Sequence, residues 1–313
     1  MKNNRWLIVV NQAAGAGKAG ADWPGIASLL EKHNFQFDAV MTQRRLHAMA
    51  LTRRLIEEKG YNRIIVVGGD GTMNEVINGV FAQKKFQTTE IMLGMISVGT
   101  GNDWARMFNL PRDYESAIIT ISQQKTFVQD AGLVTYTRSD KTWHRYFINI
   151  AGMGFGAKVV DRTNQLKQKG KSSPSLYLLN IFTSLLNYRS VKTSIQIDGE
   201  KYYRDVFSFN VGICKYNGGG MIQVPDAIPD DGLFNMTLIR KMGKLNIIAN
   251  IKKLYNGTIT RHSKVETWIG KSVIVDGPKK IHLETDGETL GHSPMEFRII
   301  PRSVKVISGN LSA

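Results

Sequence analysis

A short apolar strand that passes directly into a glycine-rich turn constrains the fold of this chain more than any other segment. Residues 64–67 (IIVV) are apolar and β-branched without alternation, a pattern typical of a strand covered on both faces in a parallel sheet. The turn at 68–72 reads GGDGT, and its glycines permit positive φ and close approach of a ligand. Thr72 and Glu75 have capping-box spacing, so a helix is predicted from residue 73. Free N–H groups and the helix dipole favour a bound phosphate there.

Asp70 is the one acid in this turn. A carboxylate beside a polyphosphate repels it unless a divalent cation lies between them, so we interpret Asp70 as a magnesium-organising acid. The alternative is an ordinary strand-to-helix turn in which Asp70 bonds its own backbone. The predicted phosphate site comprises the turn and the first helical residues: Gly69, Asp70, Gly71, Thr72, Met73, Asn74 and Glu75.

A second turn of the same kind follows the apolar run LGMISV at 93–98. It reads GTGND at 99–103 and leads into a helical pattern through Phe108. The carboxyl ends of neighbouring strands meet at one edge of an open α/β sheet, where ligands bind, so the two turns are expected side by side. Thr100 and Asn102 offer donors to phosphate or ribose, and Asp103 is expected to cap the helix.

The first part of the chain alternates strands and helices, which predicts a doubly wound parallel sheet. Strands are expected at 5–11, 35–42, 63–67 and 91–98, and helices at about 22–33, 46–59, 73–82, 102–108 and 113–121. Beyond about residue 128 the pattern changes to alternating β-rich segments, which predict a second, antiparallel domain; they include 143–150, 192–197, 202–213, 233–239, 271–275 and 281–285. We also expect a polar, turn-prone stretch at 158–175, a helix at 176–186 and two short strands within 295–308.

The first loop has a rival interpretation, because residues 15–20 spell G-x-G-x-x-G after the strand at 6–10. A dinucleotide-binding fold would need an acid at the end of the next strand. Asp38 is near the right distance, but the apolar run continues past it, so we expect it inside the strand. Nor is the loop a Walker A motif, since Gln12 replaces the first glycine and Ala19 replaces the Ser or Thr after the lysine.

The chain carries 41 Lys and Arg against 26 acidic residues, a formal net charge of +15 in 313 residues. This charge indicates an anionic partner surface. The basic pairs are not interleaved with aromatic residues and no nucleic-acid-binding motif is present, so an anionic membrane surface is favoured over nucleic acid. The single cysteine, Cys214, excludes an internal disulfide, and no segment is long enough to span a bilayer. We expect a cytoplasmic protein that associates peripherally with membranes.

Several motifs together resemble the bacterial diacylglycerol kinase and sphingosine kinase family. They are GGDGTMNEV at 68–76, GTGNDWARMFNLP at 99–111, NVGICKYNGGG at 210–220, PDAIPDDGLFNM at 225–236 and ETDGETLG at 284–291. NAD kinases and phosphofructokinases share only the Gly-Gly-Asp-Gly turn. The resemblance implies a Rossmann-like nucleotide-binding domain at 1–128, to which 296–313 returns. It also implies an antiparallel, β-sandwich-type lipid-substrate domain at 129–295, with the active-site cleft between the two.

The same resemblance implies roles for individual residues. The nucleotide pocket would be lined by Thr42 and by the first loop, in which Gln12 and Ala14 replace the family's Pro and Ser; the loop comprises Asn11, Gln12, Ala13, Ala14 and Gly15. A magnesium site is implied at Asp231 with the main-chain oxygens of Ile228 and Leu233.

Judged by composition alone, the acidic clusters at 230–231 and 284–288 are ordinary hairpin turns. The resemblance instead implies that the second cluster supplies the catalytic acids Asp286 and Glu288, with Glu288 as the general base toward a lipid hydroxyl. Asp70 is the competing candidate for the base.

These observations predict an ATP-dependent, magnesium-requiring kinase that transfers the γ-phosphoryl group to a lipid hydroxyl, with diacylglycerol as the expected substrate. The alternatives are a sphingoid base, phosphatidylglycerol or another lipid, or a soluble substrate such as that of an NAD kinase. A nucleotide sensor that docks on membranes is the non-enzymatic alternative. The sequence is compatible with a homodimer.

Overall fold

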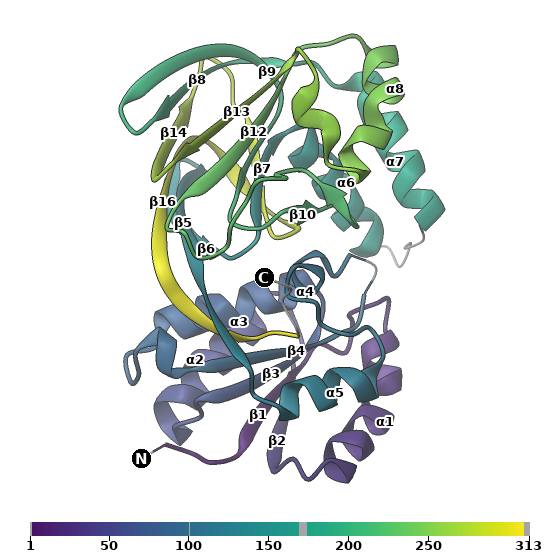
Figure 1. Ribbon diagram of the computed structural model, residues 1–313, viewed down its shortest axis with the longest axis vertical. Coiled ribbons are helices and arrows are strands. Elements are labelled where there is room, and N and C mark those ends of the chain that lie inside the picture. The colour runs from purple at the N-terminus through teal and green to yellow at the C-terminus, as the bar shows by residue number, and fades with distance from the viewer. Residues whose placement is uncertain (1, 100, 169–173, 310–313) are drawn as a thin grey trace. The chain divides into compact units, whose positions relative to one another are not determined.

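The computed structural model describes residues 2–99, 101–168 and 174–309, without side chains at 167–168 and 174–178. The chain divides into two compact units, unit 1 (Met1–Gln129 and Arg302–Ala313) and unit 2 (Asp130–Pro301). It therefore passes from one unit to the other twice, once within strand β5 (Thr126–Arg138) and once within strand β16 (Glu288–Ile307) (Figure 1).

Unit 1 is built on a parallel sheet, as predicted. Its strands are β1 (Trp6–Val10), β2 (Phe37–Met41), β3 (Arg63–Gly68) and β4 (Met92–Ser97), hydrogen-bonded in the order β2-β1-β3-β4. The end of β16 continues this sheet in parallel with β4. Nearly all residues of β1, β3 and β4 are buried, which explains their unbroken apolar runs.

Helices cover both faces of this sheet. Figure 1 shows α1 (Lys18–Lys32) and α5 (Tyr114–Ser122) on one face and α2 (His47–Lys59) and α3 (Asp70–Ala82) on the other. The apolar side chains of α1 and α5 share one core with the strands, made by Ile26, Leu30, Ile118, Ile121, Ile8, Ile65 and Ile96 among others. A 3₁₀ turn, η1 (Thr88–Glu90), precedes β4, and the short helix α4 (Asp103–Met107) follows it. The arrangement confirms the doubly wound fold.

Helix α3 begins earlier than the capping-box spacing predicts. Its first residue is Asp70, preceded by Gly69 in extended conformation. Thr72 Oγ1 accepts a hydrogen bond from Asn11 Nδ2 at 2.9 Å. The Glu75 carboxylate accepts the N–H groups of Leu46 and Ala48, 2.7 and 3.1 Å away, at the start of α2. The capping-box prediction is therefore wrong, because Glu75 caps a neighbouring helix.

Unit 2 consists largely of antiparallel strands, which confirms the second fold prediction. They are β6 (Lys141–Phe147), β7 (Ile150–Gly154), β8 (Val191–Ile197), β9 (Glu200–Gly212), β12 (Phe234–Arg240), β13 (Val265–Gly270), β14 (Ser272–Asp276) and β15 (His282–Thr285), with most of β5 and β16. The strands are ordered β13-β12-β9-β7-β15-β16. The part from β9 to β16 closes into a ring, because β14 pairs with β16 and β8, and β8 pairs with β9. A small ladder joins β10 (Tyr216–Asn217) to β11 (Met221–Ile222).

The helices of unit 2 are only partly predictable. The helix expected at 176–186 is confirmed as α7 (Pro174–Asn187). The turn-prone stretch expected at 158–175 is wrong for residues 158–168, where α6 (Phe155–Gln168) forms and buries Ala157 and Val159. It is also wrong for residues 174–175, which begin α7, and residues 169–173 lie outside the described part of the chain. Helix α8 (Lys244–Tyr255), followed by η2 (Thr258–Arg261), was not predicted. None of the described helices has the length and apolar character needed to cross a bilayer.

Two strand predictions are wrong in their bounds. The strand expected at 143–150 is two strands, β6 and β7, because the backbone N–H groups of Ile148 and Asn149 between them bind the Asp286 carboxylate. The two short strands expected within 295–308 are parts of β16, a single strand of 20 residues that pairs with β15, β14 and β4.

Candidate functional site

Three loops meet at the carboxyl edge of the parallel sheet in unit 1. The first comprises residues 11–17, between β1 and α1. The second is Gly69, between β3 and α3, and the third lies between β4 and α4. The N–H of Val98 donates to the Gly68 carbonyl at 2.8 Å, and the N–H of Asn11 donates to the Val67 carbonyl at 3.0 Å. A Cβ placed on Gly15 would lie 3.3 Å from Val98 Cγ1. These contacts confirm that the two predicted turns lie side by side.

Gly68 and Gly69 of the GGDGT turn have different surroundings. Gly68, Gly69 and Gly71 permit positive φ but do not adopt it. The nearby glycines with positive φ are in the first loop, Gly15 (62°) and Gly17 (92°). The chain enters α3 directly, so it needs no left-handed residue there. A Cβ on Gly68 would lie 2.7 Å from Thr72 Oγ1, whereas one on Gly69 would meet only the Val98 carbonyl oxygen, at 3.8 Å. Gly69 therefore leaves room for a ligand.

Asp70 joins the two turns. Its carboxylate accepts the N–H of Asp103 at 3.1 Å and that of Trp104 at 3.2 Å, the first two residues of α4. Asp103 is thus the first helical residue, preceded by Asn102 in left-handed conformation, and its expected capping role is taken by Asp70. A Cβ on Gly101 would lie 3.2 Å from Asp70 Oδ2 and 3.7 Å from Asp103 Oδ2, which places both acids beside one glycine.

The other predicted nucleotide residues differ in how they are placed. Asn11 Oδ1 accepts the N–H of Ala13 at 3.2 Å, and the N–H of Thr42 continues the sheet from Val10. Gln12, Ala13 and Gly15 are exposed, whereas the side chains of Met73 and Asn74 are fully buried. Thr100 lies outside the described residues.

A cavity of about 300 Å³ adjoins the second turn. It is lined by Ser97, Asn102, Ala105, Arg106, Asn109, Leu110 and Arg112. Asn102 Nδ2 donates to the Gly99 carbonyl at 3.1 Å, which fixes the amide orientation. Within the described part of the chain, Ser97 Oγ and Asn102 Oδ1 are buried without a hydrogen-bond partner. Buried polar atoms are normally satisfied, so both are available to a bound polar group.

The acidic turn of unit 2 is a two-residue hairpin between β15 and β16. Asp286 (φ 48°) and Gly287 (φ 83°) both have positive φ, the mark of a type I′ turn, so the hairpin interpretation of this composition is confirmed. The buried Asp286 carboxylate accepts three backbone N–H groups, from Ile148, Asn149 and Ile150, at 3.1–3.3 Å. Glu288, the first residue of β16, is partly exposed.

Glu284, at the other side of this hairpin, is completely buried. Its Oε1 accepts a hydrogen bond from Asn217 Nδ2 at 2.9 Å, and its Oε2 accepts the N–H of Gly287 at 3.0 Å. Burial raises the pKa of Glu284 to about 8, against the opposing effect of these two hydrogen bonds. The group therefore holds its proton well into the neutral range.

In the loop before β12, two carboxylates bind backbone N–H groups. Asp231 Oδ1 accepts the N–H of Leu233 at 2.9 Å, and the side chain of Ile228 is exposed. The fully buried Asp130 accepts the N–H of Gly232 at 2.7 Å and donates its own N–H to the Pro229 carbonyl. Among the described residues no three His, Cys, Asp or Glu side chains are grouped closely enough to hold a metal ion by themselves.

Sequence reasoning missed Asp130, Asn217 and Ser97. Asp130 stands in an apolar stretch that becomes β5, and a lone acid in a buried strand is a signal that could have found it. Asn217 carries no comparable signal, because its partner Glu284 is 67 residues away along the chain. Ser97 carries none either, because its burial is visible only in the folded chain.

Comparison with known proteins assigns the chain to a family. Residues 5–134 match the model of the diacylglycerol kinase catalytic domain, and residues 149–308 match that of the YegS C-terminal NAD kinase beta sandwich-like domain. The diacylglycerol kinase of Staphylococcus saprophyticus is 31% identical over 306 residues, which cover 98% of this chain and 96% of that protein. The chain belongs to the diacylglycerol kinase family. The diacylglycerol kinase of Staphylococcus carnosus is 29% identical over 302 residues, covering 96% of this chain and 94% of that one.

Solved structures share the fold of this family member. A diacylglycerol kinase from Bacillus anthracis superposes with a TM-score of 0.73 at 20% identity, covering 99% of this chain and 98% of its own. Yeast NADH kinase, complexed with NADH, gives 0.52 at 13% identity, covering 98% and 84%. Membership of the diacylglycerol kinase family makes the protein a phosphotransferase with an alcohol group as acceptor, and a kinase of this family uses ATP as donor.

Proposed function

We propose that this protein phosphorylates the free hydroxyl of diacylglycerol with ATP as donor. The observation that carries the proposal is the likeness over nearly the whole chain to proteins named diacylglycerol kinase. The three loops of unit 1 support a nucleotide site in particular. Their backbone N–H groups, the open space at Gly69 and the unsatisfied Ser97 and Asn102 atoms suit a triphosphate and its ribose.

Magnesium suits the oxygen atoms at two places. Asp70 and Asp103 lie beside Gly101. At the second place the Asp231 carboxylate, which accepts the N–H of Leu233, would be joined by the main-chain oxygens of Ile228 and Leu233. Both donor sets consist of hard oxygen ligands, which Mg²⁺ prefers, and phosphate or water oxygens would complete them. When bound, the ion neutralises charge on the phosphates. Asp70 would then serve two purposes, since it already fixes the start of α4.

Glu288 is the side chain in the acidic turn best placed to act as general base. A lipid hydroxyl is a poor nucleophile, so a carboxylate must accept its proton as the phosphoryl group is transferred. The Asp286 carboxylate is buried and holds three backbone N–H groups, whereas Glu288 is partly exposed at the start of β16. We therefore propose Glu288 as the base and Asp286 as its support.

The test is the identity of the labelled product. The purified protein is incubated with γ-labelled ATP and magnesium, in parallel with dispersed diacylglycerol, sphingosine and NAD. We expect label in the organic phase only with diacylglycerol, as phosphatidic acid identified by mass. Label transferred to sphingosine or NAD would assign a different substrate, and no transfer in any reaction would contradict the proposed activity.

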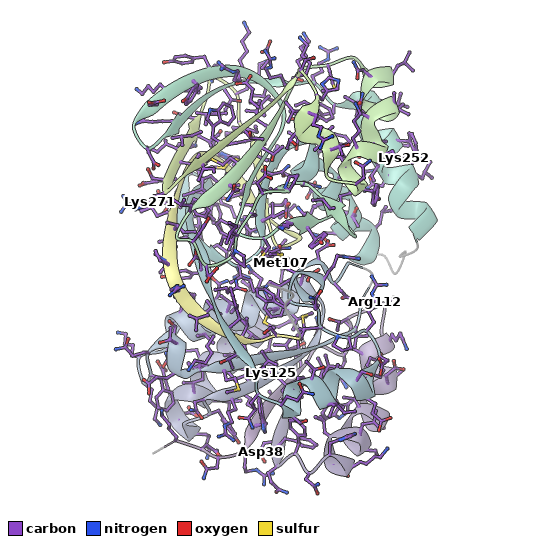
Figure 2. The ribbon with its side chains drawn as sticks, in the orientation of Figure 1. Asp38, Met107, Arg112, Lys125, Lys252 and Lys271 are labelled. Carbon is purple, nitrogen blue, oxygen red and sulfur yellow. The ribbon has the colours of Figure 1, made fainter. Side chains whose placement is uncertain are left out.

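The surface formed by α7 and α8, here called the α7–α8 face, supports an anionic membrane as partner. Both helices pack on one small core, and each exposes apolar side chains at helical spacing: Leu179, Phe182 and Leu186 on α7, and Leu245, Ile248 and Tyr255 on α8. The sequences of the two helices contain no acidic residue and three lysines, all of them on α8. Figure 2 shows one of them, Lys252, on α8. Apolar side chains flanked by lysines suit a bilayer with anionic headgroups.

Replacing Leu245 by aspartate is expected to weaken binding to phosphatidylglycerol vesicles by at least about tenfold. Leu245 is 83% exposed, and inserting such a side chain into a bilayer is worth about 1.5–3 kcal/mol. Sedimentation with vesicles of phosphatidylglycerol and of phosphatidylcholine measures the effect. Ile269→Asp, at a 60% exposed position on β13, is the matched control and should bind as the wild type does. Equal loss in both variants would remove the α7–α8 face from the proposal.

A further inference from the structure

The buried carboxyl group of Glu284 has no part in the proposed chemistry, yet it contacts the turn that carries the proposed base. Each of its two oxygens accepts one hydrogen bond, from Asn217 Nδ2 at 2.9 Å and from the N–H of Gly287 at 3.0 Å. The Asn217 side chain is fixed in turn, because its Oδ1 accepts the N–H of Gly218 at 2.8 Å. The chain of hydrogen bonds thus runs from β10 through Glu284 to the residue before Glu288.

The surrounding backbone is shaped to admit this carboxyl group. A Cβ on Gly152, in β7, would collide with Glu284 Oε1. Gly152 is the direct partner of Glu284 in the β7–β15 ladder, so a larger residue there would expel the carboxyl group from its place. A buried carboxyl group is costly unless its oxygens are bonded. An apolar side chain would avoid that cost, so simple packing does not account for a glutamate here.

We propose that Glu284 is a positioning residue that holds the Asp286–Glu288 turn, and with it the Glu288 carboxylate, in one orientation. The turn is held from two sides. Asp286 binds the backbone at 148–150, and Glu284 binds the Gly287 N–H on the side nearer to Glu288. A general base must stay within hydrogen-bond reach of the proton that it removes, so loosening this turn lowers kcat. The inference rests on the proposed function through the role of Glu288.

The substitution Glu284→Gln separates this role from plain filling of space. The glutamine side chain has the same shape, but its NH₂ group faces either the Asn217 NH₂ or the Gly287 N–H. An amide nitrogen cannot accept a hydrogen bond, whereas both oxygens of a carboxyl group can, even when the group is protonated. Adding Asn217→Asp restores the pairing with the roles reversed, since the new carboxylate accepts from the new amide and still accepts from Gly218. The double variant Asn217→Asp/Glu284→Gln is therefore the test of the hydrogen bond itself.

The experiment measures kcat and KM with diacylglycerol for the wild type, Glu284→Gln, Asn217→Asp and the double variant. We expect kcat of Glu284→Gln to fall about tenfold with KM for ATP unchanged, and the double variant to return to within about threefold of the wild type. Amide hydrogen exchange of the peptide spanning 284–289 should accelerate in Glu284→Gln and recover in the double variant.

Hydrogen exchange does not depend on activity, so it keeps the inference testable if the proposed substrate is wrong. Unchanged exchange in Glu284→Gln would overturn the positioning role. A double variant that is no better than Glu284→Gln in kcat or exchange would overturn it too. If exchange responds as expected while no variant and no wild type phosphorylates diacylglycerol, the turn is held as proposed and the proposed function has failed.

Discussion

Replacing Glu288 by glutamine is expected to lower kcat for the lipid by about 10²–10⁴-fold, the usual contribution of a positioned general base. Glutamine keeps the size of the side chain at the start of β16 and its place beside the type I′ turn, but it cannot accept the hydroxyl proton. KM for ATP should be unchanged, because the proposed nucleotide loops are all in unit 1. Initial rates of phosphatidic acid formation across ATP and diacylglycerol concentrations measure both constants.

Glu296→Gln is the matched control for this loss. Glu296 lies on the same strand, is partly exposed and pairs with Arg298, so its replacement should leave kcat near the wild-type value. Asp70→Asn serves as the comparison for the competing base. If Asp70→Asn lost activity at every magnesium concentration while Glu288→Gln kept it, the assignment of the base would pass to Asp70.

Unit 2 is expected to lose stability as pH rises from about 5 to 8, because Glu284 keeps its proton in its buried site while the unfolded chain ionises. The pKa of Glu284 is about 8 in the folded protein, raised by burial from its ordinary value of 4.5. Between these values the folded state holds a proton that the unfolded state has released, so the free energy of unfolding falls with increasing pH. The slope from this one group is about 1.4 kcal/mol per pH unit. Below the ordinary pKa of 4.5 both states are protonated, so the free energy of unfolding no longer depends on this group's titration and its contribution to stability is at its maximum.

Urea unfolding of the wild type and of Glu284→Gln at several pH values isolates this effect. Glutamine does not titrate, so the other groups of the protein contribute equally to both curves and cancel in their difference. We expect the stability of the wild type relative to Glu284→Gln to fall steadily as pH rises. Parallel curves would mean that Glu284 titrates near its ordinary pKa, and the buried geometry of this carboxyl group would then be incorrect.

The strands of unit 1 and the glycine-rich loops that end them could be recognised from local pattern. The largely apolar runs at 64–67 and 93–98 are sufficient, because a strand covered on both faces has few polar positions. Adjacency of the two turns then followed from the geometry of parallel strands, and the structure confirms it. The Asp-Gly hairpin at 286–287 was likewise predictable from composition, since a type I′ turn needs residues that tolerate positive φ.

Predictions from local sequence pattern were wrong where a side chain in a short motif binds backbone N–H groups of a distant segment. Thr72 and Glu75 have capping-box spacing, but Glu75 caps α2, 27–29 residues away in sequence. Asp70 similarly caps α4, 33 residues away in sequence, although Asp103 was the residue expected to cap that helix. Spacing alone cannot tell which helix end a carboxylate serves, because every helix leaves free N–H groups at its start.

By itself, the sequence therefore determined the class of fold, the positions of the glycine-rich loops and the family. These features depend on periodicity and on residues close together in the chain. Only the tertiary structure decided what each acid does. Asp286 reaches backbone N–H groups 136–138 residues away, and Glu284 meets Asn217 across 67 residues. Whether a carboxyl group caps a helix, holds a turn or keeps its proton depends on burial and on its hydrogen-bond partners, and the folded chain brings those partners together from distant segments.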